Sequence, residues 1–155
     1  MKGSTNSVVV PLPPADTYAL VSDPSTYPSW LVGAKEIRHV DRRWPEVGTT
    51  FKHRIGLGPL RVPGTTTVRV AEPPSRLVLG AGMGPMGEAR VEFVLREADG
   101  GTEVTVHELP RRGLVRLGWL AGRHLVTALL WGRNEISLHD LAQLAAGRRT
   151  RRSTD

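Results

Sequence analysis

Residues 49–57, TTFKHRIGL, alternate with a period of two, which predicts a β-strand that is buried on one face. Two further β-branched or apolar runs at residues 65–71 and 76–79 predict strands, and Pro73-Pro74 marks the turn between them. Residues 8–10 and 34–41 have the same strand-like character. The predicted buried face of the strand at 49–57 carries Phe51, His53, Ile55 and Leu57.

The clearest hairpin signal lies at residues 88–109, EARVEFVLREADGGTEVTVHEL. Two alternating segments flank Asp99-Gly100-Gly101, and such residues favour a tight turn between antiparallel strands. One face of the predicted hairpin carries Ala89, Val91, Phe93, Leu95, Val104 and Val106.

Helical periodicity occurs near the beginning and at the end of the chain. Pro13 and Pro14 precede a predicted short helix at residues 15–23, and a second follows within residues 24–31. A long helix is predicted from residue 114 to about 147. A strand, two short helices, about six further strands and a terminal helix indicate an α+β fold with an antiparallel sheet.

The first half of the long helix, residues 113–131, is apolar nearly all round, which predicts burial on more than one side. Arg116, Arg123 and His124 interrupt this run and argue against a membrane span. Gly118 and Gly122 each weaken a helix by roughly 1 kcal/mol relative to Ala, so they indicate either close backbone packing or space for another molecule. The second half is amphipathic, with a polar face of Arg133, Asn134, Glu135 and Gln143.

Composition and charge fit one soluble domain at residues 1–147. The chain has 155 residues and no cysteine, which excludes disulfides and thiolate chemistry. Its first residues lack the apolar stretch of a signal peptide, so we expect a cytoplasmic protein. The net charge is +6, of which residues 148–155 carry +3. We expect these residues to form a disordered basic tail, and contact with nucleic acid to involve only this tail.

Several local motifs occur in an order typical of a known family. The chain resembles the START-like (SRPBCC) superfamily over roughly residues 5–147, and within it the polyketide cyclase/dehydrase group. The motifs are Asp23-Pro24 followed by Trp30, the strand VGTTFKHRI, the turn Pro73-Pro74-Ser75-Arg76-Leu77, the hairpin Gly100-Gly101-Thr102-Glu103-Val104, and the long terminal helix.

The resemblance implies a helix-grip fold, in which a curved antiparallel sheet of about six to seven strands wraps round the last helix and leaves a cavity between them. Members bind hydrophobic molecules such as lipids, polyketides or quinones, and a minority are enzymes such as aromatase/cyclases. The segment SDPSTYPSW (22–30) would then form paired short helices at one end of the grip. Trp30 would pack between these helices and the sheet, or it would line the cavity.

Three polar residues are candidates for chemistry inside such a cavity. His53 shares a face with apolar residues and could act as a general base or anchor a ligand, or it could be a locally satisfied core histidine. Glu108 points inward if Val106 does, and could then pair with His53 or with an arginine such as Arg69, or hold a ligand hydroxyl; otherwise it ends a strand in water. His124 either faces the cavity or lies at its rim.

The segment GAGMGPMG (80–87) contains Met83 and Met86, and it is either an apolar gate or a flexible hairpin end. We assign no metal and no cofactor, because the histidines lack ligand spacing, and no nucleophile elbow is present. The predicted catalytic residue is His53. The predicted ligand-binding residues are Phe51, His53, Ile55, Met83, Met86, Val91, Phe93, Glu108, Ala121, His124, Ala128 and Trp131.

These features favour a protein that binds a small hydrophobic molecule, as a monomer or homodimer and without insertion into a membrane. A cyclase or dehydratase, working without metal or covalent nucleophile, is the alternative. A third class, an interaction protein that uses the basic tail or the apolar helix face, also stays open.

Overall fold

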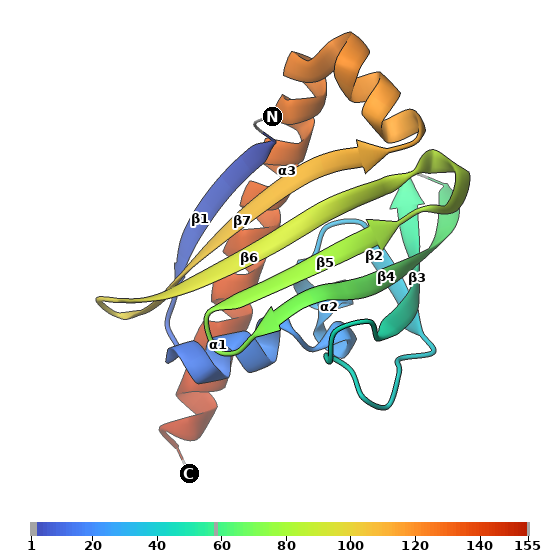
Figure 1. Ribbon diagram of the computed structural model, residues 1–155. Helices are drawn as coiled ribbons and strands as arrows, with labels where there is room; N and C mark the ends of the chain where they lie inside the picture. Colours follow the sequence, from blue (N-terminus) through green and yellow to red (C-terminus); the bar gives the residue numbers. More distant parts are fainter. Residues whose placement is uncertain (1–2, 58, 155) are drawn as a thin grey trace.

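The structure is a computed structural model that describes residues 3–57 and 59–154, and within these ranges seven antiparallel strands form one curved sheet (Figure 1). Three α-helices and two 3-10 turns complete the described part of the chain. The elements are β1 (Ser4–Val10), α1 (Pro14–Val21), η1 (Pro24–Thr26), α2 (Tyr27–Trp30), β2 (Ala34–Arg38), β3 (Thr50–Leu57), β4 (Leu60–Glu72), β5 (Arg76–Gly82), η2 (Gly84–Met86), β6 (Glu88–Ala98), β7 (Gly101–Arg112) and α3 (Leu114–Arg152).

The strand order is β1-β7-β6-β5-β4-β3-β2. Strands β2 to β7 form a meander, and β1 joins it at the β7 edge, with Ser4 opposite Glu108 and Val10 opposite Thr102. The predicted hairpin is present, since β6 and β7 join through Asp99 and Gly100, and Gly100 adopts φ +84°. The helix-grip fold expected from the resemblance is therefore confirmed, with α3 crossing one face of the sheet (Figure 1).

Residues 22–30 close one end of the core, as the resemblance implies. Asp23 caps η1 by accepting a hydrogen bond from the backbone N–H of Ser25 at 3.0 Å. The ring N–H of Trp30 donates to Thr26 Oγ1 at 3.0 Å. The buried Trp30 ring meets the rings of Tyr27 and Phe93 edge to face, at centroid distances of 5.5 and 6.3 Å. This segment therefore joins the short helices to the sheet through an aromatic cluster.

The second half of α3 packs against the sheet and buries Leu138, Leu141 and Ala145. Its first half behaves differently from the prediction, because no described side chain between residues 111 and 131 is buried. Gly122 has non-helical dihedrals of φ −137° and ψ 44°, and in Figure 1 the two parts of α3 meet at a bend that lies beyond the end of the sheet. Added Cβ atoms at Gly118 and Gly122 would meet nothing within 4 Å, so close packing does not explain these glycines.

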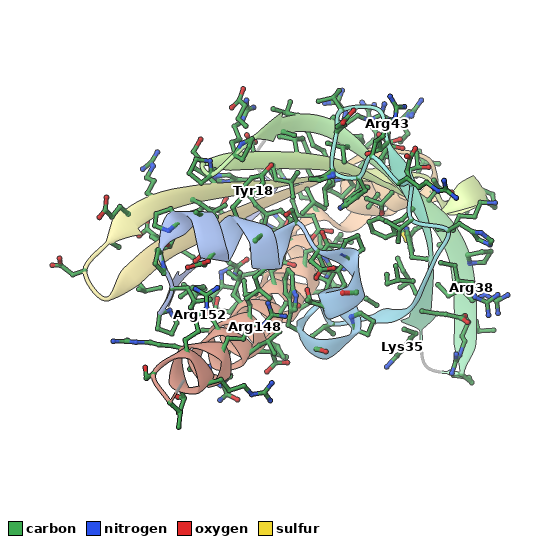
Figure 2. The ribbon with its side chains drawn as sticks, turned by 90° about the horizontal axis from the view of Figure 1, so that it is seen from below. Tyr18, Lys35, Arg38, Arg43, Arg148 and Arg152 are labelled. Carbon is green, nitrogen blue, oxygen red and sulfur yellow. The ribbon has the colours of Figure 1, made fainter. Side chains whose placement is uncertain are left out.

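Helix α3 also continues beyond the predicted domain boundary at residue 147, as far as Arg152. Arg152 donates a hydrogen bond to Asp16 of α1 at 2.8 Å. Figure 2 shows Arg148 and Arg152 on these last turns, with α1 close by. The basic segment that we expected to be disordered is therefore helical through Arg152, and an ion pair links its end to α1.

Candidate functional site

A cavity lies between the concave face of the sheet, the short helix α2 and the middle of α3. The cavity measures about 100 Å³. Most of the lining is apolar or aromatic, with side chains from α2, β3, β5, β6 and β7. The polar lining residues are His53, Thr66, Glu108, Arg133, Asn134 and Ser137.

His53 stands in the wall of this cavity because strand alternation places it on the same face as Phe51. It is 7% exposed, and its ring lies 5.9 Å from that of Phe51. A Cβ atom on Gly64, the partner of His53 on β4, would lie 2.6 Å from the imidazole Cε1 and 2.2 Å from the carbonyl oxygen of Gly82. Glycine at residue 64 therefore lets the imidazole lie close against the neighbouring strand.

The Nε2 atom of His53 is buried and has no hydrogen-bond partner among the described residues. Burial lowers the pKa of His53 from its usual value, because desolvation disfavours the imidazolium. The ring is therefore neutral at pH 7 and offers one N–H donor and one nitrogen acceptor. Such a group can bind a ligand hydroxyl or carbonyl, or take a proton from a bound molecule.

A second polar group forms on the α3 side of the cavity. Glu108 of β7 is 5% exposed and accepts hydrogen bonds from Arg133 and from the Asn134 side chain, the latter at 3.0 Å. Asn134 also donates to the Ser4 hydroxyl of β1 at 3.1 Å. The guanidinium compensates the buried carboxylate, and the cluster ties β1, β7 and α3 together.

This arrangement corrects two interpretations of the sequence. Glu108 points inward as its alternation with Val106 allows, but its partner is Arg133, whereas Arg69 pairs with Glu88 at 3.4 Å. Asn134, assigned to the polar face of α3, is buried. The sheet curves far enough round α3 to cover part of the face that looked solvent-exposed in the sequence.

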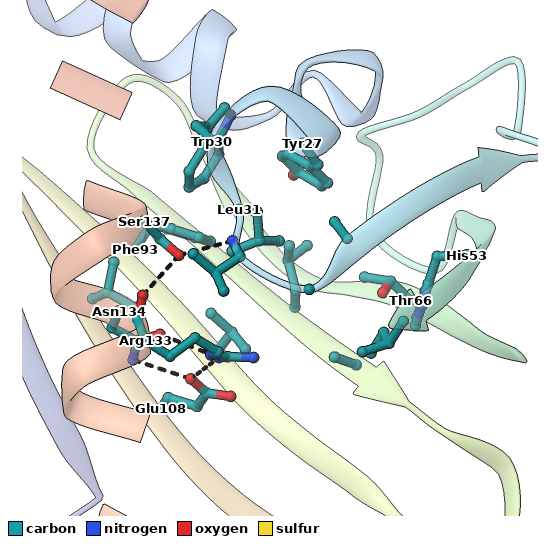
Figure 3. Close-up of a pocket in the computed structure, with 18 of the residues that line it drawn as sticks. Tyr27, Trp30, Leu31, His53, Thr66, Phe93, Glu108, Arg133, Asn134 and Ser137 are labelled. Atoms are coloured by element: carbon teal, nitrogen blue, oxygen red, sulfur yellow. Dashed lines mark hydrogen bonds and ion pairs between the residues drawn. The ribbon is translucent and has the colours of Figure 1, made fainter. Parts of the chain in front are cut away.

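Figure 3 shows how the polar side chains are distributed around the cavity. His53 and Thr66 lie on one side, and Glu108, Arg133 and Asn134 lie on the other. Tyr27, Trp30 and Phe93 belong to the apolar part of the wall; burial raises the pKa of Tyr27, which stays protonated. The cavity can therefore hold an apolar body and offer hydrogen bonds to polar groups at both of its sides.

Six of the predicted ligand-binding residues lie in the cavity wall, and six lie elsewhere. Met83 and Met86 belong to the connection between β5 and β6, which packs against the start of α3. The four predicted residues of α3 lie on its exposed first half, because the prediction assumed that this half runs along the sheet. The residues in the wall are Phe51, His53, Ile55, Val91, Phe93 and Glu108, and those outside the cavity lining are Met83, Met86, Ala121, His124, Ala128 and Trp131.

Five further residues line the cavity although they were not predicted as site residues: Tyr27, Thr66, Arg133, Asn134 and Ser137. The alternation of Thr66 with the buried Val68 was a usable signal for its inward position. Arg133 and Asn134 gave no such signal, because polar residues on an amphipathic helix are normally exposed. Among the described residues, no three His, Asp or Glu side chains gather as metal ligands would.

A comparison with protein families adds independent information. Residues 1–146 match the family described as polyketide cyclase / dehydrase and lipid transport. The chain belongs to this family. A comparison with curated protein sequences finds no significant match.

Solved structures with the same fold have low sequence identity to this chain. A Thermus thermophilus protein, TTHA0849, is 19% identical with a TM-score of 0.73, and the match covers 94% of this chain and 97% of that one. A Rhodobacter sphaeroides protein is 20% identical with a TM-score of 0.69, covering 94% and 95%. The di-domain ARO/CYC StfQ of the steffimycin biosynthetic pathway is 12% identical with a TM-score of 0.73, covering 94% of this chain and 51% of StfQ. At these identities the similarity shows the shared fold.

Proposed function

We propose that this protein binds a small hydrophobic molecule of the lipid, polyketide or quinone type in the cavity between the sheet and α3. The observation that carries the proposal is an apolar cavity whose wall contains a buried, unpartnered nitrogen, His53 Nε2. A buried polar atom without a partner costs about 1–3 kcal/mol, and a ligand oxygen or hydroxyl would remove that cost. Membership of a cyclase, dehydrase and lipid-transport family supports the same class of ligand.

The size and polarity of the cavity describe the ligand further. Small-molecule sites typically occupy roughly 300–1,000 Å³, so the cavity of about 100 Å³ would have to widen around a ligand of several rings. Arg133 offers N–H donors on one side and His53 a donor or acceptor on the other, which favours an oxygen atom at each side of an apolar body.

Native mass spectrometry of gently purified protein, compared with the same sample after denaturation, tests for a bound molecule. We expect a discrete extra mass that dissociates on denaturation. A hydroxyanthraquinone serves as a defined probe, whose fluorescence titration should saturate at one molecule per chain. If neither a copurified mass nor probe binding is found, the proposal is rejected.

A cavity-blocking variant shows whether binding takes place in this cavity. Ala81 lines the cavity and is partly exposed, so Ala81→Trp should fill the cavity and abolish probe binding while circular dichroism confirms the fold. Val47→Trp introduces the same ring at an exposed loop residue and should leave probe binding unchanged. Equal binding by both variants would place the probe elsewhere on the surface.

The second candidate function is catalysis of cyclisation and dehydration on such a molecule, and the neutral His53 favours it. As a general base, the imidazole would remove a proton from a carbon between two carbonyl groups. The resulting carbanion would attack a carbonyl carbon of the same chain, and the imidazolium would return its proton to the alkoxide to give a hydroxyl. In a later step the imidazole would take the remaining proton from the attacking carbon, a C=C bond would form as the C–O bond breaks, and the hydroxide would leave as water with that proton. The cavity walls would supply the folded conformation of the chain.

Catalysis predicts behaviour that binding alone does not. With a synthetic poly-β-ketone thioester as substrate, His53→Gln should abolish accelerated cyclisation, while hydroxyanthraquinone should still bind because the glutamine amide keeps a donor and an acceptor at this side of the cavity. The wild-type rate should rise with pH through the lowered pKa of His53, because only the neutral ring accepts a proton. Unchanged turnover in His53→Gln would exclude this histidine as the base.

A further inference from the structure

The segment at residues 111–131, here called the arm, includes the end of β7 and the kinked first half of α3. Its helical part projects from the rest of the domain (Figure 1). Six of its large apolar side chains are between 51% and 66% exposed, and no described side chain of the arm is buried. So many exposed large apolar side chains in one segment are unusual for a protein that meets only water. The six residues are Leu114, Leu117, Leu120, Leu125, Leu129 and Trp131.

The arm is also strongly basic. Between Glu108 and Glu135 the sequence contains no acidic residue, while the arm has four arginines. Within the described ranges, Arg111, Arg116 and Arg123 make no ion pair with a carboxylate, and Arg112 pairs with Glu88 at 2.9 Å. An apolar surface that also carries unpaired positive charges fits a partner that is apolar inside and anionic outside.

The geometry of the arm suits the surface of a bilayer rather than its interior. No helix among residues 3–57 and 59–154 is long and apolar enough to cross a membrane. Helices that combine exposed leucine or tryptophan with arginine lie in the interface, with their apolar side chains roughly 5–10 Å deep. The arginines that argued against a membrane span in the sequence are the groups that anionic lipid headgroups would bind.

We propose that the arm docks this protein onto anionic lipid bilayers. A second copy of the chain fits the arm less well, because pairing two arms would bring their arginines together. A nucleic acid would leave the exposed leucines in water. The arm leads into the cavity wall, since Leu129 lies one helical turn before Arg133, so docking would bring the bilayer next to α3.

Flotation with lipid vesicles tests the docking. The full chain should float with vesicles of phosphatidylcholine and phosphatidylglycerol, bind pure phosphatidylcholine vesicles more weakly, and lose binding as salt rises. Absence of flotation with the anionic vesicles would overturn the proposal. The proposal would also be overturned if deleting only residues 148–155 abolished vesicle binding, because the binding would then belong to the basic tail.

Matched variants locate the binding surface. Leu117→Glu should weaken partitioning about tenfold or more, because it removes a leucine that would be buried in the bilayer and adds a negative charge that the anionic lipids repel. Val47→Glu adds the same charge at a residue that is equally exposed outside the arm, and should change partitioning little. An equal loss in both variants would show that net charge alone controls binding, and would overturn the role of the arm.

The arginines are tested in the same way. Arg116→Gln with Arg123→Gln should weaken partitioning about 30-fold, since each basic residue near an anionic surface contributes about a fivefold change. Arg42→Gln with Arg43→Gln, an exposed pair outside the arm, is the control. Light scattering without lipid completes the test: a dimer that Leu117→Glu converts to a monomer would assign the arm to a second copy instead.

Discussion

At the scale of single residues, the burial of His53 makes the stability of the fold depend on pH. The unfolded chain has a histidine pKa of about 6.5, and burial lowers the pKa of His53 in the folded chain. Between these two pKa values the unfolded state binds the proton and the folded state does not. The free energy of unfolding therefore falls as the pH drops below about 6.5.

We predict that His53→Gln removes this part of the pH dependence. In urea titrations at pH 7.5 and 5.5, the wild type should lose more stability on acidification than His53→Gln does. His139→Gln alters an exposed histidine of α3 and should behave like the wild type. Parallel losses in all three proteins would mean that His53 does not control the acid sensitivity.

The ion pair in the cavity gives a second prediction at the residue scale. Arg133→Met would leave Glu108 buried without its cation, which costs about 3–5 kcal/mol in a fully buried pair. The Arg133 side chain is 32% exposed, so we expect a smaller loss, about 1–3 kcal/mol of unfolding free energy. Adding Glu108→Gln to Arg133→Met should restore part of the lost unfolding free energy, because the buried negative charge is then removed. A double variant as unstable as the sum of both singles would show that the two side chains are not coupled.

Single inward-facing residues were predictable wherever alternation was strict. Phe51, Phe93 and Val106 repeat every second residue with apolar neighbours, and all three are buried. The inward position of Glu108 was only conditional on that pattern. Its pairing with Arg133 was not predictable, because the two residues meet only through the packing of α3 on β7, about which local periodicity carries no information.

At the scale of elements, the close approach of β3, β4 and β5 depends on a glycine. A side chain at residue 64 would meet the Gly82 carbonyl oxygen at 2.2 Å and the His53 ring. We predict that Gly64→Ala lowers the free energy of unfolding by about 1–3 kcal/mol. Gly118→Ala adds the same methyl group where nothing lies within 4 Å, and should not destabilise the protein. Thermal unfolding of both variants checks the difference.

The strands and helices themselves were predictable, but the path of α3 was not. Alternation and turn residues indicated β3, β6 and β7 with their buried faces. The first half of α3 is apolar on all sides, so its pattern specifies no face for burial. The kink at Gly122 determines the direction of this first half. The sequence alone does not show whether a glycine in a helix allows close packing or a bend.

At the scale of the whole molecule, the basic C-terminal segment should affect charge more than stability. Deleting residues 148–155 lowers the net charge from +6 to +3 and removes the exposed pair of Arg152 with Asp16. Such pairs contribute about 0–1 kcal/mol, so urea unfolding should change by less than about 1 kcal/mol. Retention on heparin should decrease. A larger loss of stability would show that the last turns of α3 are part of the folded core.

The pairing of β1 with β7 has a consequence for the order of events during synthesis. Val10 lies opposite Thr102 and Ser4 opposite Glu108, so the first strand finds its partner only after β7 has left the ribosome. Strands β2 to β7 are joined by local turns, so each can pair with its neighbour in turn. Strand β1 must instead close a loop of about a hundred residues to reach β7. A nascent chain stalled before β7 should therefore expose β1 to chaperones and proteases, and release of β7 and α3 should end that exposure together.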